Sequence, residues 1–457
     1  MSPIDVFTTS NYTKKNPLSQ NKLNLYRFLA CPAQTFTMPI FNSFFIAFLV
    51  VYSLQQTIEL GLELLNKRHA AKQNSIPEFY LASIDEATFI KTKAYNNDKM
   101  RFGLMAHLYG IPLLWILIFS DGLHTLDHLA ASLAGANTLS QAVVYCAILL
   151  LIFTVYELPV KAYSTFVIEE RHGFNHTTKT TFIADIGKGL LLGAMLLVPM
   201  LYAIFWFLRV SGNLWWLWAW LAVTAFQLLT AAVYPAFIAP LFNKFTPLEN
   251  GDLKNRITAL AKKIGFSMSG IVISDGSKRS GHSNAYFAGF GRFRRIVLFD
   301  TLIKQLTTDE LVAVLAHEMG HNVKKHIRNG MLLSSVLSLA GFYILAQIMH
   351  WPTFFEAFNA PSQPHVAIML FSLLASAFTF PLTPIMNAWS RHNEFEADAF
   401  SAQTTLDPKA MTSALLKLTK ENLGNLTPHP WYSFYHYTHP TTLERARAIA
   451  QNARLQK

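Results

Sequence analysis

TTDELVAVLAHEMGH occupies residues 307–321, and this stretch decides the fold of the chain. Thr307 and Glu310 have the spacing of a capping box, which predicts that a helix begins at this point. Apolar residues then recur at helical spacing from Leu311 to Met319. The stretch therefore predicts one helix that carries the pattern H-E-x-x-H at its end.

His317 and His321 are candidate ligands of a metal ion. Residues four apart lie on one face of a helix, so both imidazoles can bind the same ion. Glu318 lies beside them, where its carboxylate can accept a proton from the attacking water. Zinc with an open coordination position lowers the pKa of bound water to about 7, which suits this arrangement. The alternative is two surface histidines on a helix, because a five-residue match has limited specificity.

Two histidines need a third protein ligand to hold a catalytic zinc ion. The metzincin pattern requires glycine at 324 and histidine at 327, but the chain has Lys324 and Ile327. Further along, Glu394 and Asp398 are four residues apart. We expect Glu394 to be the third ligand and Asp398 to accept the free ring N–H of a ligating histidine. Glu396 is expected to face away, and a solvated acidic helix end is the alternative to this site.

A second polar cluster lies near the C-terminus, at His436, His439 and Arg445. A histidine and an arginine beside such a site can stabilise the oxyanion that forms at the scissile carbonyl. From spacing alone, a loop histidine before an exposed helix remains the simpler interpretation. Three nearby polar residues are assigned structural or surface roles: His326, His392 and Asn393.

The composition indicates a membrane protein. Of 457 residues, 14% are charged, well below the value of about 25% that is typical of soluble domains. The two cysteines, Cys31 and Cys146, predict neither a disulfide framework nor a cysteine metal site. The net charge is +11, but the basic residues are spread over loops, so we expect no nucleic-acid binding.

Seven apolar runs approach the ~20 residues that a membrane span needs. They cover about 39–62, 103–121, 141–163, 187–209, 214–243, 331–350 and 366–388. We expect Pro235 and Pro240 to break the end of the fifth run. The predicted domains are a polar N-terminal extension at 1–37, spans one to five at 38–243, a zinc peptidase domain at 244–330, spans six and seven at 331–388, and the C-terminal part of the peptidase domain at 389–457.

Loop charges predict the orientation of these spans. The loops at 122–140 and 351–365 contain no lysine or arginine, whereas the first loop contains seven: Lys67, Arg68, Lys72, Lys91, Lys93, Lys99 and Arg101. Because basic loops stay on the cytoplasmic side, residues 244–330 and 389–457 are predicted to be cytoplasmic and the N-terminus to lie outside.

Residues 244–330 have the pattern of a small α+β domain. A helix is expected at 252–264 and strands at 270–274, 283–288 and 295–299, with a turn around 289–292 between the last two. The metal helix follows and is expected to continue into span six, which places the metal near the membrane surface. The stretch Ser283-Asn284-Ala285-Tyr286-Phe287 is the candidate sheet edge that pairs with an extended substrate, and Asn284 can add a side-chain hydrogen bond. An ordinary hairpin strand is the alternative.

The chain resembles the type I CAAX prenyl protease family, the seven-span membrane branch of the gluzincin metallopeptidases. The resemblance runs from about residue 40 to 450. It is carried by the zinc motif and by TFVIEERHGFN at 165–175, DGSKRS at 275–280, HSNAYF at 282–287, IVLFDTL at 296–302 and EFEAD at 394–398. It does not cover residues 1–37 or 122–140.

The resemblance implies an α-helical polytopic membrane protein in which seven transmembrane helices enclose a water-filled chamber, with a small gluzincin-type zinc peptidase domain. By position, the resemblance implies that one Zn²⁺ is bound by His317, His321 and Glu394. Glu318 matches the catalytic glutamate, and Asp398 matches the aspartate that accepts a hydrogen bond from a ligating histidine. The family's C-terminal His-Pro and arginine elements match His439-Pro440 and Arg445. Eukaryotic members remove the last three residues of prenylated CAAX proteins, so the expected partners are peptide or protein substrates and the lipid bilayer. No oligomer is implied.

Three rival functions stay open from the sequence. The first is a quality-control protease that cleaves membrane proteins without prenyl specificity. The second is a transporter or channel with a vestigial metal site, although retention of the general base Glu318 disfavours it. The third is a metal-free binding protein for lipidated peptides. The chain ends Leu455-Gln456-Lys457, without a dilysine signal, which favours a bacterial inner membrane over the endoplasmic reticulum.

Overall fold

The computed structural model describes residues 39–289 and 294–455. The N-terminal extension, Cys31 and most of the turn expected at 289–292 lie outside these residues. Cys146 is buried and free.

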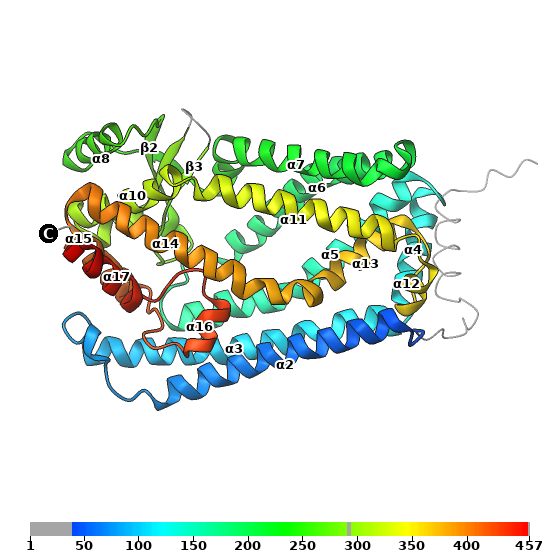
Figure 1. The fold of residues 1–457 in the computed structure, drawn as a ribbon, viewed down its shortest axis with the longest axis horizontal. Coiled ribbons are helices and arrows are strands. Elements are labelled where there is room, and N and C mark those ends of the chain that lie inside the picture. Colours follow the sequence, from blue (N-terminus) through cyan, green and yellow to red (C-terminus); the bar gives the residue numbers. More distant parts are fainter. Residues whose placement is uncertain (1–38, 290–293, 456–457) are drawn as a thin grey trace, which may run out of the picture. The chain divides into compact units, whose positions relative to one another are not determined.

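Seven helices in the described part of the chain are long and apolar enough to cross a membrane. The chain is therefore a polytopic helical membrane protein, as predicted. The helices are α2 (Ser43–Lys72), α3 (Glu86–Phe119), α5 (Leu139–Tyr163), α6 (Lys179–Val210), α7 (Trp215–Val233), α11 (His326–Ile348) and α13 (Pro364–Thr379), the last continuing into α14 (Thr383–Thr405). Figure 1 shows these helices running along the long axis of the unit Pro39–Lys457.

The spans are longer than the apolar runs, and their ends explain why. Pro235 and Pro240 end the regular part of α7 as expected, and the chain continues as the π-helical turn η4 (Tyr234–Ile238) and the 3₁₀ turn η5 (Ala239–Leu241). Span three likewise continues from α5 into η2 (Ser164–Glu169), a π-helical segment. Both extensions are on the side of the peptidase domain, and η2 supplies contacts described below.

The loops without basic residues both contain a helix that the sequence did not predict. These are α4 (Gly122–Ala134) and α12 (Pro352–Ala357). His365 Nε2 lies 2.7 Å from a carboxylate oxygen of Asp127, so α13 is joined to α4. Figure 1 shows α4 and α12 together at the end of the bundle opposite the sheet.

The peptidase domain is built on a four-stranded sheet with the order β1-β2-β4-β3. The strands are β1 (Phe245–Pro247), β2 (Gly270–Ser274), β3 (Ala285–Ala288) and β4 (Arg295–Phe299), and α8 (Asp252–Lys263) lies between the first two. The sequence predicted all of these except β1, which follows the last turn of span five. β2 and β4 are parallel, whereas β3 is antiparallel to β4 and forms an edge of the sheet.

The metal helix begins as predicted but ends earlier than expected. After α9 (Asp300–Gln305), Thr307 caps α10 (Thr308–Val323) and the complete capping box with Glu310 is present. The expected continuous helix into span six is wrong, because Lys325 adopts a left-handed conformation with φ 64° and a new helix, α11, begins at His326.

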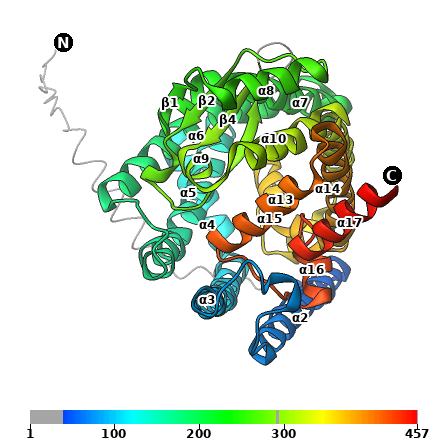
Figure 2. The ribbon, with the colours of Figure 1, turned by 90° about the vertical axis from the view of Figure 1, so that its left-hand side faces the viewer.

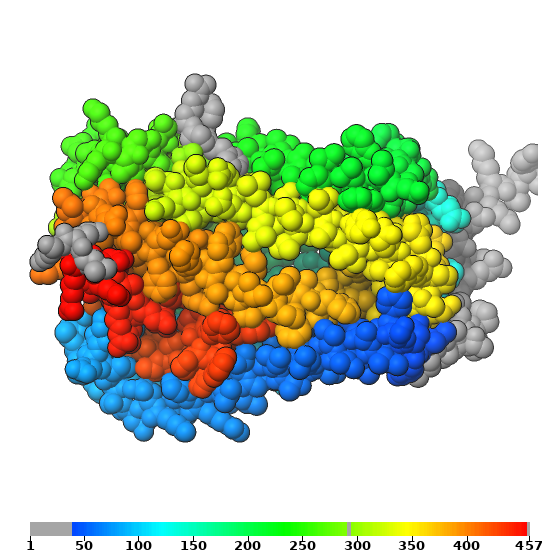
Figure 3. Space-filling view, in the orientation of Figure 1, coloured from blue at the N-terminus to red at the C-terminus, as the bar shows by residue number. Residues whose placement is uncertain are grey.

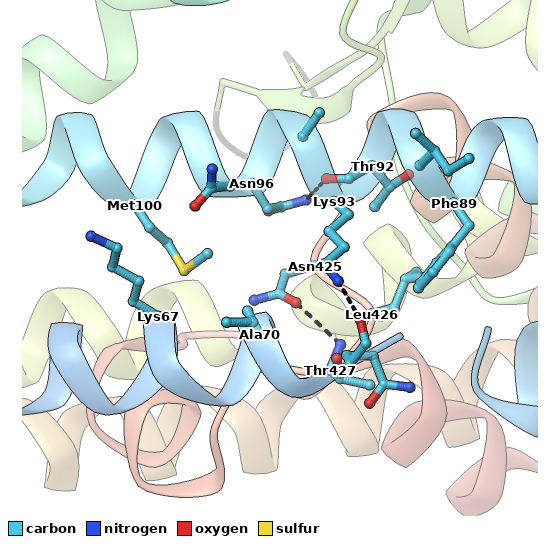
Figure 4. A pocket seen from close by; sticks show the side chains of 15 residues that line it. Lys67, Ala70, Phe89, Thr92, Lys93, Asn96, Met100, Asn425, Leu426 and Thr427 are labelled. Atoms are coloured by element: carbon cyan, nitrogen blue, oxygen red, sulfur yellow. Dashed lines mark hydrogen bonds between the residues drawn. The ribbon is translucent and has the colours of Figure 1, made fainter. Parts of the chain in front are cut away.

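The C-terminal part packs between the peptidase domain and the first two spans. It contains α15 (Pro408–Glu421), α16 (Pro430–His436) and α17 (Thr442–Leu455). Asn96 of α3 donates to the carbonyl of Leu423 at 2.8 Å. Figure 4 shows the neighbouring pocket of about 460 Å³, which is lined by residues of α2, α3 and the 425–427 loop, among them Lys93 and Asn425. Figure 2 shows α16 lying against α2 at the end where the chain terminates.

The seven-span count predicts which loops share a side of the membrane. Ala136, Ser362 and Gln451 are all exposed, so each can be replaced by cysteine in a Cys31→Ala background, where the remaining Cys146 is buried. We expect a membrane-impermeant maleimide to label Ala136→Cys and Ser362→Cys from one side and Gln451→Cys only from the other. Labelling of all three from one side would contradict the count.

Candidate active site

The site forms where α10 packs directly on α14. Gly320 makes this approach possible, since a Cβ at this position would lie 3.2 Å from the Cα of Ala397 and 3.1 Å from the ring of Phe400. The buried hydroxyl of Ser401 donates to the carbonyl of Ala313 at 2.6 Å and ties the same two helices together. The glycine of the H-E-x-x-H pattern therefore brings the two ligand-bearing helices into contact.

Three potential ligands converge at this contact. His317, His321 and Glu394 offer ligand atoms that all lie within 4.8 Å of one another. The two Nε2 atoms are 3.2 Å apart, and each lies 3.3 to 3.4 Å from an oxygen of Glu394. The structure thus brings together the residues that the sequence predicted for metal binding.

The other ring nitrogen of each histidine is already engaged. Nδ1 of His317 lies 2.9 Å from Asp398, as expected. Nδ1 of His321 lies 3.0 Å from Nδ1 of His326, whose Nε2 is 3.1 Å from Glu396. If each Nδ1 of the two ligands carries the proton, both Nε2 atoms present lone pairs toward the same point.

The residues fit a divalent metal ion. Two imidazole lone pairs and a carboxylate crowded within 4.8 Å repel one another unless a cation lies between them. Oε2 of Glu394 is buried and has no hydrogen-bond partner among the described residues. Burial lowers the pKa of His317, but the carboxylates of Asp398 and Glu394 outweigh that effect and raise it to about 9. The negative field that attracts a proton here also attracts a metal ion.

Glu318 lies next to this group and is available for proton transfer. Its side chain is half-buried, and no hydrogen bond or ion pair holds its carboxylate within residues 39–289 and 294–455. Burial raises the pKa of Glu318 above its ordinary value. A raised pKa suits a carboxylate that must accept a proton and then release it.

The two C-terminal candidates differ in how they are held. Arg445 is buried, and its guanidinium donates to both carboxylate oxygens of Asp398 at 2.8 and 2.6 Å. His439 is 64% exposed at its side chain, and its Nε2 lies 3.4 Å from Glu394. His436 does not belong to the site, because its ring packs against Tyr432 and Tyr435 in α16.

The candidate substrate strand has a free side. The amide of Phe299 donates to the carbonyl of Asn284 at 3.0 Å, and hydrogen-bonded pairs alternate along an antiparallel ladder. Tyr286 and Ala288 therefore bond to β4, whereas the backbone groups of Ala285 and Phe287 point to the open edge. Ser283 and Asn284 precede the strand rather than belong to it, and β3 itself packs against α10.

A polar cluster fixes the start of this strand against the membrane helices. Nε2 of His282 lies 3.2 Å from Glu169 in η2, and the hydroxyl of Tyr95 in α3 donates to the same carboxylate at 2.9 Å. Nδ1 of His282 lies 3.0 Å from Asn422, and the ring stacks on Phe174 at 4.0 Å. Residues from four distant segments thus determine where β3 begins.

The sequence missed two residues that support the metal ligands. His326 was assigned a structural role and Glu396 was expected to face away from the metal. Glu396 is indeed not among the three converging ligands, but it holds His326, which contacts His321. A signal was present, because an H-E-x-x-H helix needs a partner for each ligating histidine.

Two family models match the chain and together cover most of it. Residues 66–244 match "CAAX prenyl protease N-terminal, five membrane helices". Residues 247–453 match "Peptidase family M48". The second match contains the three candidate metal ligands, Glu318, Asp398 and the strand β3.

Curated relatives and a solved structure agree with these matches. CAAX prenyl protease 1 of Saccharomyces cerevisiae is 34% identical over 82% of this chain and 89% of the relative. The human CAAX prenyl protease 1 homolog is 32% identical over 80% of this chain and 86% of the relative. The crystal structure of S. mikatae Ste24p has a TM-score of 0.82 at 33% identity, covering 90% of this chain and 99% of that one. The chain therefore belongs to the CAAX prenyl protease family of M48 peptidases, and it is a membrane-embedded metalloprotease.

Proposed function

We propose that the chain is a zinc endopeptidase that cleaves prenylated CAAX-type peptides beside the membrane. One observation carries the proposal: two histidine Nε2 atoms and the Glu394 carboxylate converge within 4.8 Å, with the unpaired carboxylate of Glu318 adjacent. A set of three protein ligands is typical of catalytic zinc, which keeps its fourth position for water or substrate. His317, His321 and Glu394 would hold the ion, which when bound polarises the scissile carbonyl and acidifies the attacking water.

The residues of the chain have separate tasks in this reaction. Glu318 accepts a proton from the water as it adds to the carbonyl carbon, and passes that proton to the nitrogen of the leaving amine as the C–N bond breaks. His439 stabilises the negative charge on the carbonyl oxygen, since its exposed side chain is free to approach the substrate. Arg445 orients Asp398, because three of its guanidinium contacts go to Asp398 and His317.

The substrate class follows from the relatives. Those reported above are named CAAX prenyl proteases, and this chain matches them across both the membrane part and the peptidase part. The seven spans are proposed to enclose the chamber in which the substrate is cut. A quality-control protease without prenyl specificity is the rival, and cleavage of matched prenylated and unprenylated peptides separates the two.

We further propose the orientation that the loop charges predict. The peptidase domain at 244–330 and its C-terminal part at 389–457 face the cytoplasm, joined through spans six and seven. This arrangement suits substrates that are prenylated and anchored on the cytoplasmic leaflet. The choice between a bacterial inner membrane and the endoplasmic reticulum stays a prediction, as does the division into domains at these boundaries.

Replacing Glu318 with glutamine tests the mechanism and the substrate class together. We expect the purified Glu318→Gln protein to keep its bound metal and its thermal unfolding temperature, because Glu318 is not a ligand. Cleavage of a farnesylated CAAX peptide should fall by about 10² to 10⁴ in rate, the usual contribution of a general base. Wild-type cleavage by this variant would refute the mechanism. Equal cleavage of farnesylated and unmodified peptide by the wild type would favour the rival function.

The relay from His321 through His326 to Glu396 predicts a graded effect on metal affinity. His326→Ala removes the partner of the ligand and should weaken zinc binding or activity by about 10- to 100-fold. Glu396→Gln keeps an oxygen acceptor for His326 and should have a smaller effect, whereas Glu394→Ala removes a ligand and should have a larger one. Zinc affinity from competition with a chelator measures all three. Equal affinity of His326→Ala and wild type would show that the contact has no supporting role.

The open edge of β3 predicts a sharp difference between two substitutions at one position. Ala285→Pro removes an N–H that points away from β4, so the sheet keeps its ladder but loses a donor to the substrate. Ala285→Gly keeps that N–H and is the matched control. We expect both to bind zinc and only Ala285→Pro to lose peptide cleavage, with Asn284→Ala milder. Zinc content and turnover are measured on the same samples, and normal turnover by Ala285→Pro would exclude β3 as the strand that pairs with substrate.

A further inference from the structure

A large apolar cavity lies inside the membrane part of the molecule. Its volume is about 930 Å³, and it is lined by residues of five helices, α2, α11, α12, α13 and α14. The walls include Phe44, Gly341, Ile344, Leu374 and Phe378. Figure 3 shows the surface hollowed at this place, between α11 in yellow and α13 in orange, with more distant helices visible through the opening.

The cavity and the metal site lie along one face of one helix. Thr383 and Asn387 line the cavity, and Glu394 follows them on α14 at intervals of eleven and seven residues. These intervals are close to three and two helical turns, so all three side chains lie on the same face. At 1.5 Å per residue, Asn387 and Glu394 are separated by roughly 10 Å along the axis.

We propose that this cavity binds the isoprenoid chain of the substrate while the adjoining peptide bond lies at the metal site. The inference rests on the proposed function and extends it to the place of the prenyl group. If the last three residues of a CAAX sequence are removed, the bond that is cut follows the prenylated cysteine directly. The isoprenoid must therefore lie close to the scissile bond, and it needs an apolar cavity that begins next to the ligands.

The chemistry of the lining favours a hydrocarbon over a polar chain. The polar group nearest the metal site, the amide of Asn387, is already donating to the carbonyl of Tyr435 at 2.6 Å. The remaining walls are almost entirely aliphatic or aromatic, and most come from membrane-spanning helices. A peptide segment placed there would bury backbone groups that have no hydrogen-bond partner, which is strongly unfavourable. An isoprenoid has no such groups.

Gly341 offers a direct way to fill the cavity. Gly341 lines the cavity, and a Cβ added at this position meets no heavy atom within 4 Å, so a side chain can be introduced here without a clash at its first atom. Gly341→Phe places an aromatic ring in the cavity from α11, and Ala375→Leu narrows it from α13. Val336→Phe is the matched control, because Val336 is on α11 and is 61% exposed but does not line the cavity.

The test compares a farnesylated and an unmodified peptide of the same sequence, cleaved by the full-length protein in lipid nanodiscs. Exclusion of only two methylene groups changes affinity by about tenfold, so we expect both cavity variants to raise KM for the farnesylated peptide by about tenfold or more. Their kcat/KM for the unmodified peptide should be unchanged, and Val336→Phe should alter neither. Two variants from opposite walls are used so that misfolding of one leaves the comparison intact.

The outcomes separate the inference from the proposed function. If the wild type prefers the farnesylated peptide and both variants keep the full preference, the cavity is not the isoprenoid site, although the proposed function stands. If both peptides are affected equally in the variants, the cavity holds bilayer lipid or has a structural role, and the inference is overturned. If the wild type shows no preference for the farnesylated peptide, the proposed substrate class fails first.

Discussion

The contact between α10 and α14 at Gly320 is the constraint on which the rest of the structure depends. His317, His321 and Glu318 lie on one helix and Glu394 and Asp398 on the other. Without a Cβ at Gly320, the backbone of α14 approaches closely enough for the three ligands to share one ion. Spans six and seven connect α10 to α14 as a hairpin. The chain therefore leaves the site after α10, crosses the membrane twice and comes back to the site in α14.

Beside this contact, the buried charges of Asp398 and Arg445 are partners of one another. Asp398 receives two hydrogen bonds from Arg445 and lies 2.9 Å from Nδ1 of His317. Removing one partner of such a buried pair leaves an uncompensated charge, which is more destabilising than the pair is stabilising. The cluster therefore serves to fix orientation and charge at the ligand rather than to add net stability. A carboxylate held in this way keeps the proton of His317 on Nδ1, leaving Nε2 for the metal ion.

Local signals in the sequence were enough to predict the parts of the site that depend on spacing. Two of these signals are local patterns: the capping box at Thr307 and the histidines four residues apart. The third is the hairpin of two spans, which returns Glu394 to the side of the membrane where the histidines lie. His326 could not be predicted in the same way, because its contact with His321 depends on the left-handed turn at Lys325. The link between Glu169 and His282 joins residues 113 positions apart, and nothing in either local pattern indicates the other.

The helix α14 carries both the candidate ligand Glu394 and part of the wall of the apolar cavity. This one helix therefore connects the membrane part of the molecule to the candidate metal site. A soluble peptidase can position a ligand on any helix of its core, whereas here Glu394 lies on the continuation of the seventh span. A helix is stiff over the two turns between Asn387 and Glu394, since each of its backbone groups is hydrogen-bonded within it. A change in the packing of α14 inside the bilayer can therefore be transmitted along the helix to Glu394. In the proposed complex, the lipid-embedded part of the substrate would influence the position of Glu394 through this helix, and a separate soluble domain would not provide such a connection.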